Sequence, residues 1–242
     1  QHEQVLYPDM AGVARSHDYY PMEGMVPEDG VASVVLGHKA LAELITMGGT
    51  AAILGKTLEG YGLDSGDLWR HSLGVAFGSK IIANRRKPAL ANDGFTAGLI
   101  HDAGKLILNT YISERWESFE AVMNDESKSF LEAEREILGF DHGESASEVC
   151  KKWNIPKTLT TAIRYHHEPA RSQGDELTYI VHVADAVSMM ASLATGVDGM
   201  AYEVDEKAKG VLGLRDDDVN GIMLEVLSAV EKISEQVASP PD

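Results

Sequence analysis

The middle of the chain reads Gly98-Leu99-Ile100-His101-Asp102-Ala103-Gly104-Lys105-Leu106. Apolar residues lead to an imidazole and a carboxylate that stand side by side. His101 and Asp102 would offer a divalent cation one nitrogen and one oxygen, and the second oxygen of Asp102 would be available to bridge to another ion. Lys105 follows one helical turn after Asp102, where it would stand beside an anion held by the metal. This segment is typical of a metal site.

Further ligand types lie on both sides of this segment. A His-Asp pair by itself is more often a hydrogen-bonded histidine beside a solvated aspartate, so it needs partners before it indicates a metal. The chain supplies them in Leu68-Trp69-Arg70-His71-Ser72, Phe140-Asp141-His142-Gly143-Glu144, Tyr165-His166-His167-Glu168-Pro169 and Val183-Ala184-Asp185-Ala186. Each of these residues has a structural explanation when taken singly. Taken together, they favour metal binding.

The order His, His-Asp, His, His-His, Asp resembles the HD superfamily of metal-dependent phosphohydrolases. It is most similar to the HDOD branch (HD-related output domain), whose pattern runs Leu-Trp-x-His-Ser, Gly-Leu-x-His-Asp-x-Gly-Lys, Gly-Phe-Asp-His, His-His-x-Pro and His-x-Ala-Asp. The resemblance implies a first metal site made of His71, His101, Asp102 and Asp185. In the members with two metals it implies a second ion held by Asp102, His142, His166 and His167.

The resemblance also implies hydrolysis of a phosphoester or a nucleotide. Imidazole and carboxylate ligands suit one or two divalent transition-metal ions, with iron or manganese favoured and nickel, cobalt or zinc as alternatives. Two ions roughly 3.5 to 4 Å apart would hold a hydroxide and polarise a phosphoryl group. Asp102 would bridge the ions and Lys105 would add charge or a proton, so these two are the predicted catalytic residues. The Glu168-Pro169 sequence after His167 replaces the Gly-Tyr-Pro signature of cyclic-di-GMP phosphodiesterases, which argues against that substrate.

A second class of function stays open beside hydrolysis. HDOD domains also resemble bacterial-type signalling or output modules, in which the metal would be structural and a protein partner would be bound. The complete ligand set keeps hydrolysis open but does not exclude this alternative. A small phosphorylated ligand and a signalling protein are therefore both expected partner classes, and the oligomeric state is left open.

Four residues near the motifs have weaker claims to a role. Asp67 is interpreted as part of a helix cap rather than as a ligand. His182 is expected to pack in the core or to support a ligand. Arg70 and Arg164 are candidate phosphate contacts, although no motif supports them.

Composition narrows the partner classes further. The chain carries 21 basic and 38 acidic side chains, and its formal net charge of −17 opposes binding to a nucleic-acid backbone. A metal in a pocket could still attract a small anion. No run reaches the roughly 18 to 20 apolar residues of a membrane span, and the amino terminus has no secretion signal. Cys150 is the single cysteine, so we expect a cytoplasmic protein in which Cys150 is a small buried helix residue.

The hydrophobic pattern predicts an all-α fold, because no stretch alternates as a strand does. Residues 1–62 are expected to form a partial helical N-terminal lobe, and residues 63–242 an HD-like helical bundle that binds the metal and ends in a C-terminal helix. Pro88 and an Asn92-Asp93-Gly94 turn should close the helix of His71, and residues 114–139 should be a mostly solvated helical stretch that ends at Gly139. The other expected helices span residues 95–108, 142–153, 156–165, 177–193 and 218–237.

Overall fold

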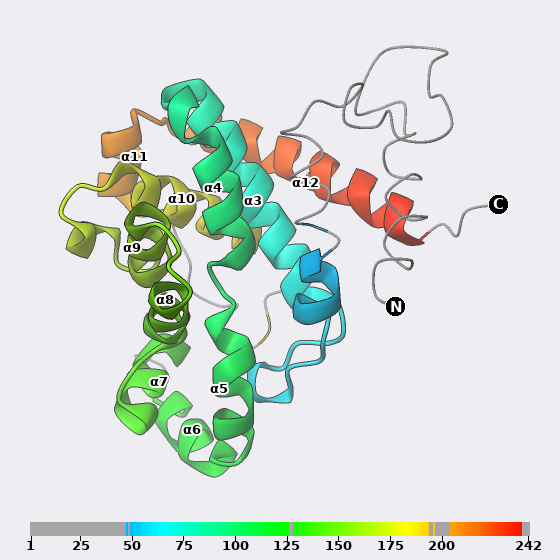
Figure 1. Ribbon diagram of the computed structural model, residues 1–242, viewed down its shortest axis with the longest axis vertical. Helices are drawn as coiled ribbons and strands as arrows, with labels where there is room; N and C mark the ends of the chain where they lie inside the picture. The colour runs from blue at the N-terminus through cyan, green and yellow to red at the C-terminus, as the bar shows by residue number, and fades with distance from the viewer. Residues whose placement is uncertain (1–46, 48, 126–127, 194–195, 197–203, 239–242) are drawn as a thin grey trace.

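The computed structural model describes residues 47, 49–125, 128–193, 196 and 204–238, and this part of the chain is helical (Figure 1). Its elements are η1 (Glu59–Tyr61), α3 (Asp67–Arg86), η2 (Pro88–Leu90), α4 (Ala91–Ile100), α5 (Gly104–Ser113), α6 (Trp116–Met123), α7 (Phe130–Leu138), α8 (His142–Lys152), α9 (Lys157–Tyr165), η3 (Pro169–Ser172), α10 (Glu176–Met190), α11 (Glu206–Leu212) and α12 (Asp216–Ala238). Within these residues the only β-type pairing is an isolated bridge between Leu58 and Leu63. The predicted all-α fold is confirmed.

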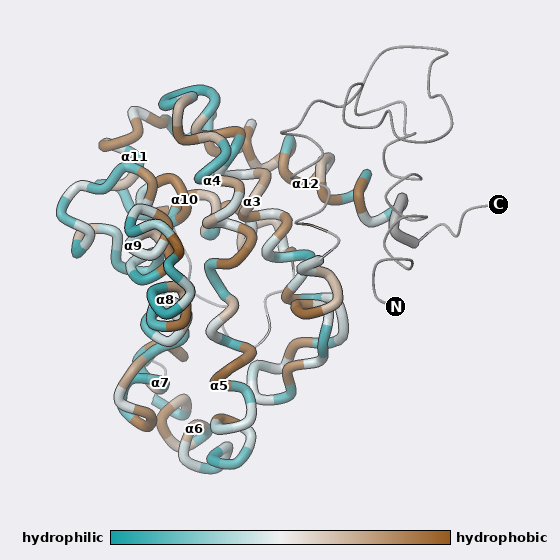
Figure 2. Tube along the Cα trace, in the orientation of Figure 1, coloured by the Kyte–Doolittle hydropathy of each residue, from teal (hydrophilic) through white to brown (hydrophobic). Residues whose placement is uncertain are grey.

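Two helices form the centre of the molecule. α10 is buried along twelve consecutive residues from Leu177 to Ser188, and α3 packs against α4, α10 and α12. A helix that is buried on all sides needs apolar or small residues all round, and α10 and residues 71–79 of α3 consist mostly of such residues. α12 instead alternates apolar and polar residues along its length, as Figure 2 shows, because it covers the core with one face only. In the described residues no helix is both long and apolar enough to cross a membrane.

The predicted continuous helix over residues 95–108 is wrong. α4 ends at Ile100, residues 101–103 form a turn, and α5 begins at Gly104. A Cβ atom on Gly98 would lie 2.7 Å from the Val75 carbonyl oxygen, and one on Gly104 would lie 1.9 Å from the His142 carbonyl oxygen. The first contact fixes α4 against α3 and the second fixes α5 against α8. α4 packs on α3 and α5 packs on α8, so the turn at residues 101–103 joins two helices with different packing partners.

The predicted Asn92-Asp93-Gly94 turn is also wrong, because these residues lie inside α4. Pro88 opens the short helix η2, and α4 follows it directly. Asp93 suits the first turn of a helix, where its charge faces the positive end of the helix dipole. Gly94 lies against Ser79, since its missing Cβ would come within 3.3 Å of that residue. Close packing between α3 and α4 therefore explains the glycine.

Several predicted helix ends are confirmed by their hydrogen bonds. Asp141 caps α8 by accepting a bond from the Glu144 backbone N–H at 2.7 Å, and Gly139 ends α7 in the left-handed region at φ 85°. Asp67 is the first residue of α3 and accepts a bond from the Asp64 backbone N–H at 2.9 Å, but the N-cap position is Gly66 and no side chain caps this helix. Cys150 is buried on α8. The division at residues 62 and 63 stays a prediction, since residues 1–46 lie outside the described part.

Candidate metal centre

All seven predicted metal ligands come together at one buried point, although they lie on five different segments. His71 comes from α3, Asp185 from α10, and His142 from the first residue of α8. His101 and Asp102 come from the turn between α4 and α5, and His166 and His167 directly follow α9. Their donor atoms form overlapping groups within 4.8 Å, namely Asp102 with His142, His166 and His167, His71 with His101 and Asp102, and His101 with His166 and Asp185.

The first group is arranged around one oxygen of Asp102. His71 Nε2 lies 3.7 Å from Asp102 Oδ2 and 3.0 Å from Asp185 Oδ1. His101 Nε2 lies 3.4 Å from the same Asp102 oxygen. The Nδ1 atoms of both rings face backbone carbonyls, those of Leu193 at 3.2 Å and Gly98 at 2.7 Å. Because Nδ1–H donates to these carbonyls, each Nε2 faces the centre, as a metal-binding histidine requires.

The second group is arranged around the other oxygen of Asp102. His142 Nε2 lies 3.2 Å from Asp102 Oδ1 and His166 Nε2 lies 3.7 Å from it. His167 Nε2 lies 2.9 Å from His142 Nε2, and His167 Nδ1 lies 3.7 Å from Asp185 Oδ2. His166 donates its Nδ1–H to the Ile163 carbonyl at 2.7 Å. The two oxygens of Asp102 therefore face two different sets of imidazoles.

Buried atoms without a hydrogen-bond partner provide a test of the fit to a metal. Among the described residues, His101 Nε2, His166 Nε2 and Asp102 Oδ1 are buried and accept or donate no hydrogen bond. A buried polar atom without a partner costs free energy, so such atoms are rare in stable proteins. All three atoms point into the same cluster, and all are donors to a cation. The residues present fit a bound metal.

Both carboxylates of the cluster are ionised. Burial opposes their charge, but the charges of His101 and Lys105 outweigh it and hold the pKa of Asp102 well below its ordinary value. For Asp185, burial is likewise outweighed by the hydrogen bond with His71 and by the charge of His101, and the pKa is lowered. The ionised form is the one that binds a cation.

The imidazoles fall into two electrostatic classes. Burial is the largest cause that lowers the pKa of His166 to about 3, and burial also lowers the pKa of His167. Both rings are neutral and carry the lone pair that a metal needs. His142 differs, because Glu134 and Asp102 outweigh burial and raise its pKa to about 10. A cation bound by His142 Nε2 would take the place of a proton.

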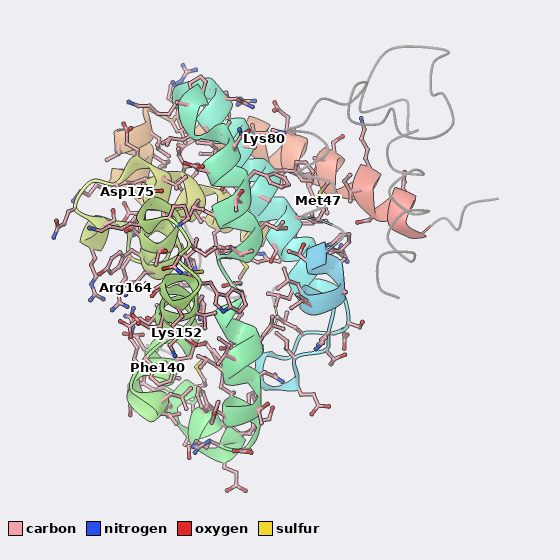
Figure 3. All side chains as sticks on the ribbon, in the orientation of Figure 1. Met47, Lys80, Phe140, Lys152, Arg164 and Asp175 are labelled. Atoms are coloured by element: carbon pink, nitrogen blue, oxygen red, sulfur yellow. The ribbon has the colours of Figure 1, made fainter. Side chains whose placement is uncertain are left out.

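The other residues that the sequence singles out take different positions. Lys105 is buried, and its Nζ lies 2.8 Å from Asp102 Oδ2, as its place in the motif predicts. His182 is buried and donates Nδ1–H to the His166 carbonyl at 2.7 Å, so it supports a predicted ligand. Arg70 is exposed. Arg164 pairs with Glu144 at 2.7 Å on the outer side of α9, as Figure 3 shows, so neither arginine joins the cluster.

The sequence analysis missed Glu134. It lies in the stretch interpreted as mostly solvated, yet its side chain is fully buried against His142. A signal was present, because Glu134 follows the buried Phe130 by four residues and therefore shares the apolar face of α7. An acidic residue on the apolar face of a helix indicates a buried partner.

Comparisons with known proteins agree with this arrangement. The HDOD domain model matches residues 14–169. An HDOD domain protein of unknown function from Geobacter sulfurreducens is 25% identical and superposes with a TM-score of 0.73, over 98% of this chain and 82% of that chain. A proposed phosphohydrolase from Shewanella amazonensis SB2B gives 18% identity and a TM-score of 0.70, over 98% of this chain and 84% of that chain.

A proposed signal transduction protein from Marinobacter aquaeolei VT8 gives 19% identity and a TM-score of 0.67, and this chain spans 96% of its own length but 52% of that protein. Among curated proteins, nothing matches the chain. The family model covers well over half of the sequence, including every predicted metal ligand except Asp185, which lies beyond the matched residues. The chain belongs to the HDOD domain family.

Proposed function

We propose that this HDOD domain is a metal-dependent phosphohydrolase with two metal positions that share Asp102. The observation that carries the proposal is the position of Asp102, whose two oxygens face separate sets of imidazole nitrogens. A carboxylate in this position is suited to bridge two cations. The first position would be held by His71, His101, Asp102 and Asp185, and the second by Asp102, His142, His166 and His167.

Mixed imidazole and carboxylate ligands favour iron or manganese at both positions. Two such ions supply Lewis acidity toward a phosphoryl oxygen and activate water for attack at phosphorus. The protein would contribute the fixed ring orientations, a site from which most water is excluded, and the Lys105 ammonium beside Asp102. Lys105 would hold positive charge or a proton close to the leaving oxygen of a phosphoester or nucleotide.

Burial of the donors favours a second candidate function. The ligand side chains are buried, and even that of His167 is only 12% exposed. A site of this kind could hold a structural ion in a signalling module that binds a protein partner. A proposed signal transduction protein with 19% identity shares this fold, so the fold is compatible with a signalling module.

The experiment that tests the proposal compares wild type with Lys105→Met. Both proteins are expressed with iron and manganese supplied, their metal content is measured, and generic phosphoesters are screened. We expect equal metal content, because a protonated lysine does not bind metal, and a hydrolysis rate at least about tenfold lower in the variant. Methionine retains the apolar stem of Lys105, so the packing is kept.

Three outcomes would contradict parts of this proposal. Less than about a tenth of an ion per wild-type chain would remove the metal site. Metal without hydrolysis in either protein would favour the signalling module. Loss of metal from Lys105→Met would mean that Lys105 supports the ligands rather than the reaction.

A further inference from the structure

α7 contributes no predicted ligand, yet its Glu134 side chain lies directly behind His142. Glu134 is fully buried and accepts hydrogen bonds from the His142 backbone N–H at 2.9 Å and from the Tyr61 hydroxyl at 2.6 Å. His142 Nδ1 lies 2.9 Å from Oε2 and 3.1 Å from Oε1 of the same carboxylate. All of these hydrogen bonds are accepted by the Glu134 carboxylate. Glu134 therefore fixes both the backbone and the ring of His142.

The next residue on α7, Arg135, donates hydrogen bonds to the segments that precede His142 and follow His167. Arg135 donates from Nε to Asp141 Oδ2 at 2.8 Å, and its Nη2 donates to Glu168. Asp141 directly precedes His142, and Glu168 directly follows His167. Two consecutive residues of α7 thus bind both segments that carry the histidines of the second metal position. Among the described residues, no hydrogen bond joins Glu134 or Arg135 to a histidine of the first metal position.

The acceptor behind His142 differs from those behind His71, His101 and His166. His71, His101 and His166 donate Nδ1–H to neutral backbone carbonyls. A carboxylate acceptor makes a stronger, charge-assisted hydrogen bond and makes the opposite ring nitrogen a better metal donor. The His142 ring is therefore oriented more strongly than the rings of His71, His101 and His166.

We propose that Glu134 is a positioning residue that makes the second metal position a tight site. It holds the His142 ring with Nε2 toward Asp102, while Tyr61 holds the carboxylate from the segment before α3. The inference rests on the two metal positions of the proposed function. It adds that the two positions are supported independently, so that one can be weakened while the other is kept.

The test is a titration of metal-free protein with Mn²⁺, in wild type and in Glu134→Gln. Glutamine has nearly the same shape but no charge, so the hydrogen bond from the His142 ring Nδ1–H is no longer charge-assisted, and an amide NH2 group replaces one of the two acceptor oxygens. We expect wild type to bind two ions, and the variant to bind the first equally well and the second roughly 10- to 100-fold more weakly. Electron paramagnetic resonance should change from the signal of a coupled manganese pair to that of an isolated ion at equal loading.

Two further variants separate positioning from general destabilisation. Ser129→Ala removes the cap of the same helix, where Ser129 and Glu132 form a capping box away from the site. It should lower Tm but still bind two ions. Tyr61→Phe removes one bond to Glu134 and leaves its contacts with His142. It should weaken the second ion alone and by less than Glu134→Gln, which keeps the test available if Glu134→Gln does not fold.

The outcomes distinguish this inference from the proposed function. Binding of a single ion by wild type would overturn the arrangement of two positions itself. Equal binding of two ions by wild type and Glu134→Gln would overturn the role of Glu134 and leave the two positions intact. Equal weakening of both ions in Tyr61→Phe would show that the positions are not supported independently.

Discussion

Asp102 is the residue on which the geometry of the site depends. Its carboxylate is nearly fully buried, with Lys105 and two imidazoles facing Oδ2 and two further imidazoles facing Oδ1. A buried charge is stable only when it is paired. Lys105 pairs with one oxygen, and the other has no hydrogen-bond donor among the described residues. A cation held between Asp102 Oδ1 and the imidazoles that face it would give this oxygen a direct partner.

At this scale we predict that Asp102→Asn prevents binding of at least one ion and also destabilises the metal-free protein. The substitution removes the carboxylate charge that lies 2.8 Å from the buried Lys105 ammonium, and breaking a buried ion pair costs about 3–5 kcal/mol. Chemical denaturation of chelator-treated protein measures this cost. The double variant Asp102→Asn, Lys105→Met removes both charges and should recover most of the stability without recovering the metal. Equal free energies of unfolding for Asp102→Asn and for the double variant would contradict the ion pair between Asp102 and Lys105.

At the scale of single helices, local sequence was sufficient for most of the fold. Caps such as Asp141 and the left-handed Gly139 act within one turn of the chain, so their residue types reveal them. The break at residues 101–103 has no such local signal. It arises because Gly98 meets α3 and Gly104 meets α8, and these contacts join residues distant in sequence. Spacing alone therefore suggested one long helix.

The ligands of the candidate site could be predicted from the sequence, but the residue that supports them could not. The seven candidate ligands could be found in the sequence because each belongs to a short motif, and the structure brings them together. Glu134 belongs to no quoted motif, and its partners Tyr61 and His142 lie 73 and eight residues away. Supporting residues act through tertiary packing, so a charged pattern such as that of residues 114–139 conceals them. Their identification required coordinates.

The close contact between α5 and α8 leads to a prediction for Gly104→Ala. The new Cβ would lie 1.9 Å from the His142 carbonyl oxygen, so α5 and α8 must move apart. We expect a loss of about 1–3 kcal/mol in the free energy of unfolding, typical of overpacking, and weaker binding of the second ion because Asp102 and His142 separate. Urea denaturation and metal titration measure these two effects.

Gly221→Ala is the matched control for this prediction. Gly221 lies inside α12, and a Cβ there would meet nothing within 4 Å. Alanine should therefore stabilise the helix by about 0.5–1 kcal/mol through its higher helix propensity. A gain in the free energy of unfolding in Gly104→Ala, as expected for Gly221→Ala, would contradict the close packing of α5 on α8.

At the scale of the whole molecule, the cluster joins segments that are far apart in the sequence. α3, α8 and α10 each contribute a ligand, as do the turn between α4 and α5 and the residues after α9. A cation at the centre would bind all of these segments at once. The unfolded chain cannot hold them together, so binding free energy becomes folding free energy.

This leads to the prediction that metal removal lowers Tm and that metal return restores it. A ligand that binds only the native state adds about 2.7 kcal/mol of stability at a free concentration of 100 times Kd. For a chain of 242 residues, this corresponds to a shift of about 5 to 11 °C. Differential scanning calorimetry before chelation, after chelation and after Mn²⁺ addition measures it. The double variant His71→Ala, His142→Ala removes one ring from each position, so its Tm should not respond to Mn²⁺. A chelator-induced shift that persists in that variant would place the stabilising ion elsewhere in the molecule.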